Sequence, residues 1–220
     1  MINNKKLELK QMLMAQAGLV EKMVSIAIGG LYDRDSSFVD GVMVFEKRVN
    51  DIEMELEKKC TSLIALHQPE AKDLRIILMI YKINNDLERL GDQAVNIAES
   101  AAQLVGNPVI VELPELSTMK DATLSMLKES LDAFAREDVS VARKVCNDDN
   151  VVDELNRSIY KHLVRLIKDN PLHTELYLHI LRIAKNLERI GDLSTNIAEN
   201  TIYLVNGISP KHHTEEKTEV

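Results

Sequence analysis

Two stretches of nearly identical sequence, one hundred residues apart, constrain this chain more than any other feature. They read LERLGDQAVNIAE at Leu87–Glu99 and LERIGDLSTNIAE at Leu187–Glu199, and nine of their thirteen positions are identical. Similarity at a fixed spacing is typical of a chain built from repeated structural units. The sequence therefore predicts two copies of one unit, each filling about half of the 220 residues.

Both stretches carry the apolar spacing of a packed helix. Apolar or small residues recur at alternating steps of three and four, which places them along one side of a helix. In the first copy they are Ile80, Ile83, Leu87, Leu90, Ala94, Ile97, Ala101 and Leu104, and in the second Ile180, Ile183, Leu187, Ile190, Ser194, Ile197, Thr201 and Leu204. Each repeated stretch is therefore expected to be a helix that buries one face.

The same spacing extends through the rest of the chain and is interrupted by Gly, Asn and Pro residues. The expected helices cover residues 4–31, 36–67, 71–105, 115–136, 139–168 and 174–205. Each half thus reads as two long helices, a proline-containing turn and a third long helix. Pro69 and Pro171 lie in the matching turns.

This order of elements predicts an all-α fold of two tandem three-helix bundles, with six long antiparallel helices related by the internal repeat. The first bundle is expected over residues 1–108 and the second over residues 109–207, where a short apolar connector at 109–113 precedes its first helix. Residues 208–220, ISPKHHTEEKTEV, have the composition of a disordered polar tail.

Composition narrows the classes of function. The formal net charge is −8 and the chain has no basic block, which argues against direct electrostatic binding to nucleic acid or anionic lipid. No run approaches eighteen apolar residues, and no amino-terminal signal segment is recognisable. Cys60 and Cys146 lie far apart and form no C-x-x-C motif, which is typical of reduced, packed thiols. We therefore expect a soluble cytoplasmic protein.

Two features of the repeated motif destabilise a helix locally. Glu88 and Asp92 are like charges four residues apart, which costs about 0.2–0.5 kcal/mol in an isolated helix, and Gly91 between them costs about 1 kcal/mol relative to alanine. The second copy keeps this pattern from Glu188 to Asp192. Carboxylate oxygens suit a hard or borderline cation, and glycine lets a second helix, a ligand or a partner approach the backbone. A solvated acidic face, partly neutralised by the arginine of each motif, is the other interpretation.

Two further pairs lie on the second helix of each half. They are Asp149 with Asp153, and Glu46 with Asn50, where asparagine replaces the second acid. Oxygen-bearing side chains from two adjacent helices can close a cation site that a single pair cannot, although surface charge alone would also explain these two pairs. The predicted metal ligands are Glu46, Asn50, Glu88 and Asp92 in the first bundle and Asp149, Asp153, Glu188 and Asp192 in the second.

No catalytic constellation is recognisable in the sequence. No Glu-x-x-His or H-E-x-x-H pattern occurs, which argues against a ferritin-like oxidase site and a zinc protease site. A phosphate-binding loop, a G-x-S-x-G motif and a dinucleotide fingerprint are also absent. The chain is therefore not expected to be an enzyme.

From about residue 5 to residue 207, the chain resembles the PhoU family of phosphate-signalling proteins. The motifs that carry the resemblance are QPEAKDLR at Gln68–Arg75, LERLGD at Leu87–Asp92, LDAFARED at Leu131–Asp138 and LERIGD at Leu187–Asp192. The resemblance implies the same pair of three-helix bundles and metal clusters held by E(D)-x-x-x-D motifs. Those motifs correspond here to Glu88/Asp92, Glu188/Asp192 and Asp149/Asp153, whereas Glu46/Asn50 departs from the pattern.

The resemblance also implies a cytoplasmic negative regulator of phosphate uptake and phosphate-starvation signalling. Such a protein acts as an adaptor between the phosphate ABC transporter and the sensor histidine kinase, and it reaches the membrane only through these partners. It implies a homodimer and a bound metal cation, such as iron, zinc or another divalent ion. Two alternatives stay open, namely an accessory protein of another phosphate transporter and a metal-dependent enzyme that uses the carboxylate pairs.

Overall fold

The computed structural model describes residues 2–30, 36–105 and 113–208, which form six long helices and one short 3₁₀ turn. The elements are α1 (Ile2–Gly29), α2 (Phe38–His67), α3 (Ala71–Ala102), α4 (Pro114–Arg136), α5 (Val139–Asp169), η1 (Pro171–His173) and α6 (Thr174–Asn206). No strand occurs within these described ranges, so the predicted all-α fold is confirmed. Apart from Leu113 and Ile208, the expected connector at 109–113 and tail at 208–220 lie outside the described residues.

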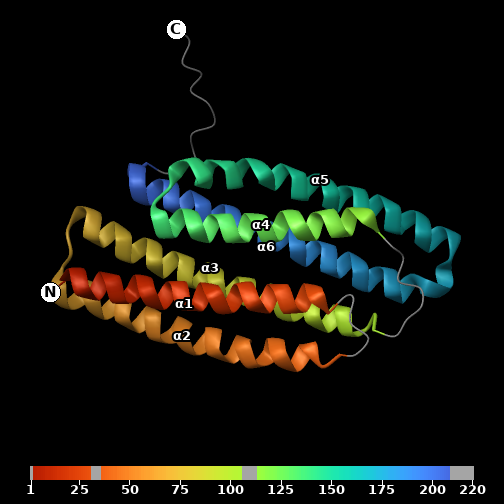
Figure 1. The fold of residues 1–220 in the computed structure, drawn as a ribbon, viewed down its shortest axis with the longest axis horizontal. Helices are drawn as coiled ribbons and strands as arrows, with labels where there is room; N and C mark the ends of the chain where they lie inside the picture. Colours follow the sequence, from red (N-terminus) through yellow and green to blue (C-terminus); the bar gives the residue numbers. More distant parts are fainter. Residues whose placement is uncertain (1, 31–35, 106–112, 209–220) are drawn as a thin grey trace, which may run out of the picture.

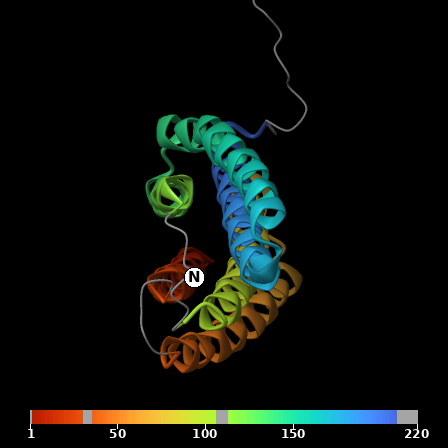
Figure 2. The same ribbon diagram turned by 90° about the vertical axis from the view of Figure 1, so that its right-hand side faces the viewer.

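The helices form two bundles of three, one from each half of the chain (Figure 1). The first contains α1, α2 and α3, and the second α4, α5 and α6. The bundles join mainly through α3 and α6, the two helices with the repeated motif, and through a smaller contact between α1 and α4. Seen end-on, α1 faces α4 on one side of the molecule and α3 adjoins α6 on the other (Figure 2). The repeated motifs are therefore brought to the junction of the bundles.

The helices end where local residues can close the last turn. Gln68 follows α2 with a left-handed φ of 43°, and its N–H donates to the Ile64 carbonyl. Glu137 takes the same role after α4 with a φ of 56°, and Gly207 after α6 with a φ of 74°. These three ends lie within one residue of the predicted ends at 67, 136 and 205.

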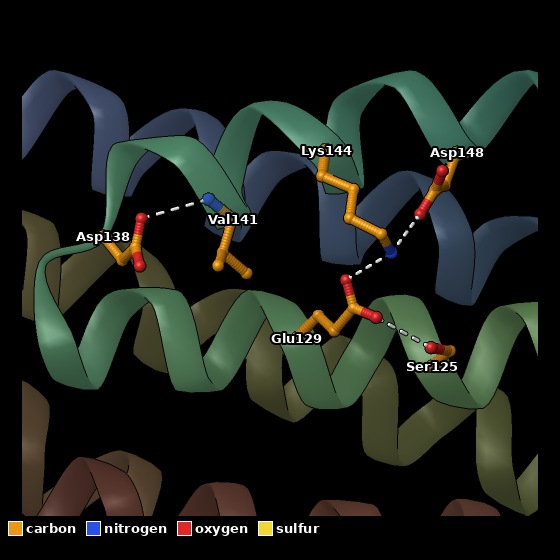
Figure 3. Close-up of polar contacts among 6 residues, drawn as sticks. All are labelled: Ser125, Glu129, Asp138, Val141, Lys144 and Asp148. Carbon is orange, nitrogen blue, oxygen red and sulfur yellow. Dashed lines mark hydrogen bonds and ion pairs between the residues drawn. The ribbon is translucent and has the colours of Figure 1, made fainter.

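Side-chain contacts hold the turn between α4 and α5 (Figure 3). The Asp138 carboxylate caps α5 by accepting a hydrogen bond of 3.1 Å from the Val141 N–H. Further along, Lys144 on α5 donates to Glu129 on α4 at 2.6 Å and to Asp148 at 2.9 Å. These contacts join α4 to α5 and reach Asp148, one residue before Asp149, an acidic residue that belongs to the candidate site described below.

One continuous apolar core runs through both bundles. It contains the interior positions that the repeat predicts, which are fully buried: Leu87, Leu90, Ala94, Ile97, Leu187, Ile190 and Ile197. Ser194 and Thr201 on the same face are fully buried as well, and each hydroxyl donates to the backbone carbonyl four residues earlier. Small residues at these positions therefore satisfy their polar groups within their own helix.

By length and mean hydropathy, α1 is apolar enough to cross a membrane, with a mean hydropathy of 1.3 over its most apolar eighteen residues. A core helix of a water-soluble bundle passes the same test. Leu13, Val20 and Val24 of α1 lie in the core of the first bundle. Polar residues interrupt the apolar runs of α1. A count of consecutive apolar residues therefore does not reveal how apolar this helix is on average, whereas the mean hydropathy does.

Candidate metal centre

Each repeated motif places its glycine against a neighbouring helix of its own bundle. A methyl group at Gly191 would lie 3.3 Å from the Asp149 carboxylate and 3.4 Å from Val152 on α5. A methyl group at Gly91 would lie 3.7 Å from Val49 on α2. Val49 and Val152 are the residues that the sequence aligns between the two halves, so the repeat extends to the packing around each glycine. The glycine thus admits a second helix, one of the options that the sequence left open.

Four predicted ligands gather between α5 and α6. We call Asp149, Asp153, Glu188 and Asp192 the second acidic cluster. Burial, followed by the negative charges of Asp192, Asp153 and Glu188, raises the pKa of Asp149 to about 6, while the Thr195 hydroxyl acts in the opposite direction. Burial and then the charges of Glu188 and Asp153 raise the pKa of Asp192 as well. The four carboxylates therefore lie close enough for their negative charges to raise the pKa of Asp149 and Asp192.

Two basic side chains offset part of this charge. Lys185 donates to Glu188 at 2.7 Å, and Arg157 donates to Asp153 at 3.1 Å. Asp149 and Asp192 form no ion pair with any residue that the structure describes. The positive charges of Lys185 and Arg189 act on Asp192 without forming a direct ion pair, and they lower its pKa in part.

An open cavity of about 640 Å³ borders the second acidic cluster. Asp149 and Asp192 lie on its wall together with Arg189, and α3 of the first bundle contributes Arg89 and Gln93. The motif arginines of both repeats thus meet at one cavity. Because the two bundles line it jointly, this site depends on the packing of α3 against α6.

The first bundle carries a similar group, which we call the first acidic cluster: Glu46 and Glu53 on α2 with Glu88 and Asp92 on α3. Burial raises the pKa of Glu88, and the charges of Asp92, Glu53 and Glu46 raise it further. Burial also raises the pKa of Glu53, with a further contribution from the charge of Glu57. Carboxylates of the two helices therefore repel one another here too.

The sequence-based prediction did not name Glu53 as a ligand. That prediction named Asn50, one turn earlier on α2, because aligning the two halves places Asn50 opposite Asp153. The residue opposite Glu53 in the second half is Asn156, so acid and amide have exchanged places along the helix. A search for acids one turn away from a missing ligand would have found Glu53. Each acidic cluster consequently has four carboxylates, and the predicted ligand Asn50 lies on the same face of α2 as Glu46 and Glu53.

The clustered side chains offer the type of donor atom that binds cations, but in this structure they do not converge on one position. Among the described residues, no three Asp, Glu, His or Cys side chains converge closely enough to hold a metal ion. All eight clustered side chains offer carboxylate oxygens, the ligands of hard and borderline cations. A positive ion would also relieve the repulsion that raises the pKa values of Glu88, Asp149 and Asp192. Holding a cation therefore requires these half-buried and exposed carboxylates to turn toward one another.

The two cysteines lie in surroundings that disfavour the thiolate form. Cys60 and Cys146 are free thiols. Burial raises the pKa of each thiol to about 11, which keeps both protonated at neutral pH.

Known proteins share both the sequence and the fold of this chain. A family model described as the PhoU domain matches residues 13–101 and 116–201, once in each half. A phosphate-specific transport system accessory protein PhoU homolog of Pseudomonas aeruginosa is 37% identical over 209 residues, covering 93% of this chain and 85% of the relative. The homolog of Aquifex aeolicus is 35% identical over 213 residues and covers 96% of both chains. The crystal structure of PhoU from Pseudomonas aeruginosa has a TM-score of 0.91 at 35% identity, covering 94% of this chain and 100% of that one.

Proposed function

The chain belongs to the PhoU family, and on this premise we propose that it is an accessory protein of a phosphate-specific transport system that represses phosphate uptake and phosphate-starvation signalling. The observation that carries the proposal is the family match in each half of the chain, together with relatives named for that transport system over 85% or more of their length. The high TM-score to a PhoU crystal structure supports it as well.

The proposed role is that of a cytoplasmic adaptor between the phosphate ABC transporter and the sensor histidine kinase. Both acidic clusters lie at least partly exposed on the helices, and cytoplasmic loops of membrane proteins are rich in Lys and Arg. Opposite charges steer such surfaces together and select the correct partner. An adaptor transmits a signal only if it binds one state of its partner more tightly than another. We therefore expect tighter binding in phosphate-replete cells, and a homodimer in solution.

Metal binding by the two acidic clusters is part of the proposal, with iron, zinc or another divalent ion as the cation. The cation would supply positive charge that offsets the carboxylate repulsion and joins neighbouring helices. The chain's own residues prepare the second cluster: Lys185 and Arg157 hold Glu188 and Asp153 by hydrogen bonds, and Gly191 leaves room for Asp149. A cation that binds only the folded chain would also raise its stability.

A deletion strain tests the proposed function. Phosphate-starvation genes should be expressed in phosphate-rich medium without this protein, and a plasmid copy of the gene should restore repression. A tagged copy should capture the transporter and the kinase from membranes, and added salt should weaken that capture because exposed charge contacts are screened. Normal repression in the deletion strain together with no capture of either partner would refute the role. Capture of a different phosphate transporter, with normal repression, would favour an accessory protein of that transporter.

A further inference from the structure

A second cleft, of about 440 Å³, lies where α3 of the first bundle passes α6 of the second. It shares Arg89 and Asn196 with the cavity described above, but no member of either acidic cluster lines it. Its volume is within the range of about 300–1,000 Å³ that is usual for small-molecule sites. The metal proposal therefore leaves this cleft without a role.

The internal repeat supplies a comparison within the same molecule. In the other half of the α3–α6 contact, Arg182 donates to the Asn96 side-chain oxygen at 2.7 Å and to Glu99 at 3.2 Å, which bridges the two helices. The spacing of one hundred residues pairs Arg182 with Lys82, which lies in the open cleft. Lys82 forms no hydrogen bond or ion pair with the part of the chain that the structure describes. Arg182 thus bridges the two helices on one side, whereas Lys82 forms no such bridge on the other among the described residues.

The open side also differs from its counterpart in composition. Two of the five tyrosines of the chain lie in this cleft, together with two asparagines, and none of the four is kept in the other half. The pairs are Tyr81 with Leu181, Tyr203 with Gln103, Asn85 with Lys185, and Asn200 with Ser100. Both halves build the same helix packing, so that packing does not require these aromatic and amide groups.

The side chains of the open cleft are partly prearranged. The Tyr81 hydroxyl donates to Glu57 at 2.8 Å, which ties the ring to α2. Asp86 is 8% exposed and lies 3.8 Å from Arg89, so it holds that guanidinium at the cleft. The charged lining is mixed, because Lys82 and Arg89 present cationic N–H donors of the kind that bind phosphate oxygens while Asp86 and Glu199 present carboxylates. Tyrosine rings offer flat surfaces on which a nucleobase stacks.

We propose that this cleft binds a nucleotide, with the phosphate at Lys82 and Arg89 and the base against Tyr81 and Tyr203. The amides of Asn85 and Asn200 would then accept and donate hydrogen bonds to the polar edges of the base and ribose. This inference goes beyond the proposed regulatory function and does not depend on it. Because both bundles line the cleft, a bound nucleotide would contact α3 and α6 at once.

The test is titration of the full-length protein with AMP, adenosine and inorganic phosphate, each without divalent cations. Calorimetry gives the affinity, and tyrosine fluorescence reports on stacking because the chain has no tryptophan. Lys82→Met and Tyr203→Leu should each weaken AMP binding at least about tenfold, which corresponds to about 1.4 kcal/mol. Arg182→Met is the matched control at the bridged position, and it should leave AMP affinity unchanged. Circular dichroism should show the same helix content in all variants.

Three results would overturn the assignment. They are a wild-type chain that does not bind AMP, phosphate that binds as tightly as AMP, and an Arg182→Met variant that loses as much affinity as Lys82→Met. Adenosine should bind more weakly than AMP, since it lacks the group that the two cationic side chains would hold. Equal affinity for adenosine and AMP would count against the assigned role of Lys82.

Discussion

Alanine at Gly91 and alanine at Gly191 should affect stability differently, although the two glycines occupy the same position in the repeated motif. Alanine in the middle of a helix gains about 1 kcal/mol over glycine, and a buried methyl group adds up to about 0.8 kcal/mol. At Gly91 the nearest atoms to the new methyl would be Met23 at 3.5 Å and Val49 at 3.7 Å, which are ordinary contacts. Gly91→Ala should therefore stabilise the folded chain by about 1–2 kcal/mol.

At Gly191 the same methyl group would meet Asp149 at 3.3 Å and Val152 at 3.4 Å. Asp149 would have to move by a few tenths of an ångström while Val152 lies at the limit of ordinary contact, and overpacking of a core costs about 1–3 kcal/mol. The packing cost should cancel the gain in helix propensity, so Gly191→Ala should leave stability unchanged or lower it. The difference arises because a carboxylate lies against the second glycine and only apolar side chains lie near the first.

Thermal unfolding followed by circular dichroism, in chelator at neutral pH, measures the contrast. In a chain of this size, 1 kcal/mol corresponds to about 2–4 °C in melting temperature, so Gly91→Ala should melt several degrees above Gly191→Ala. Urea unfolding provides a second measure of the same difference. Equal stabilisation by both substitutions, or a larger gain at Gly191, would refute the reasoning from packing.

Three further predictions follow from the acidic clusters and one helix cap. The folded-state pKa of Asp149, about 6, lies above its ordinary value of 3.8, so the folded chain binds this proton more tightly than the unfolded chain does. The stability gained from this proton is present below about pH 4 and is lost as the pH rises through 6. In melting temperatures measured over a pH series, Asp149→Asn should flatten that decline. The double variant Glu188→Gln, Asp192→Asn should keep its helices, but elemental analysis should show that it has lost the metal of the second bundle. Glu53→Gln should lose only the metal of the first bundle. Unchanged metal content in both variants would indicate a solvated acidic face. Asp138→Ala should cost about 1 kcal/mol in urea unfolding because α5 loses its N-terminal cap, and no loss would show that the cap is dispensable.

Periodicity along the chain determined the secondary structure and the two-bundle fold. The spacing of Leu87, Leu90 and Ile97 predicts which face of a helix is apolar. The repeat at Leu187 and Ile197 indicates that the second half has the same arrangement of helices. These are properties of consecutive residues, so no tertiary information is needed to recognise them. Helix ends at Gln68 and Glu137 likewise agree with the breaks visible in the sequence.

Only the tertiary structure decided which solvent-facing residues meet. An apolar stripe shows that another helix covers this face. It does not show which helix covers it, or how far the two helices are shifted relative to each other along their axes. A shift of one turn changes every polar contact between them. Glu53 joins Glu88 in one cluster because α2 and α3 pack at one particular shift. The same reason explains why Arg182 bridges α3 and α6 while the matching Lys82 leaves a cleft. Both outcomes depend on how far a side chain reaches from one packed helix to the next, which the order of residues within a single helix does not contain.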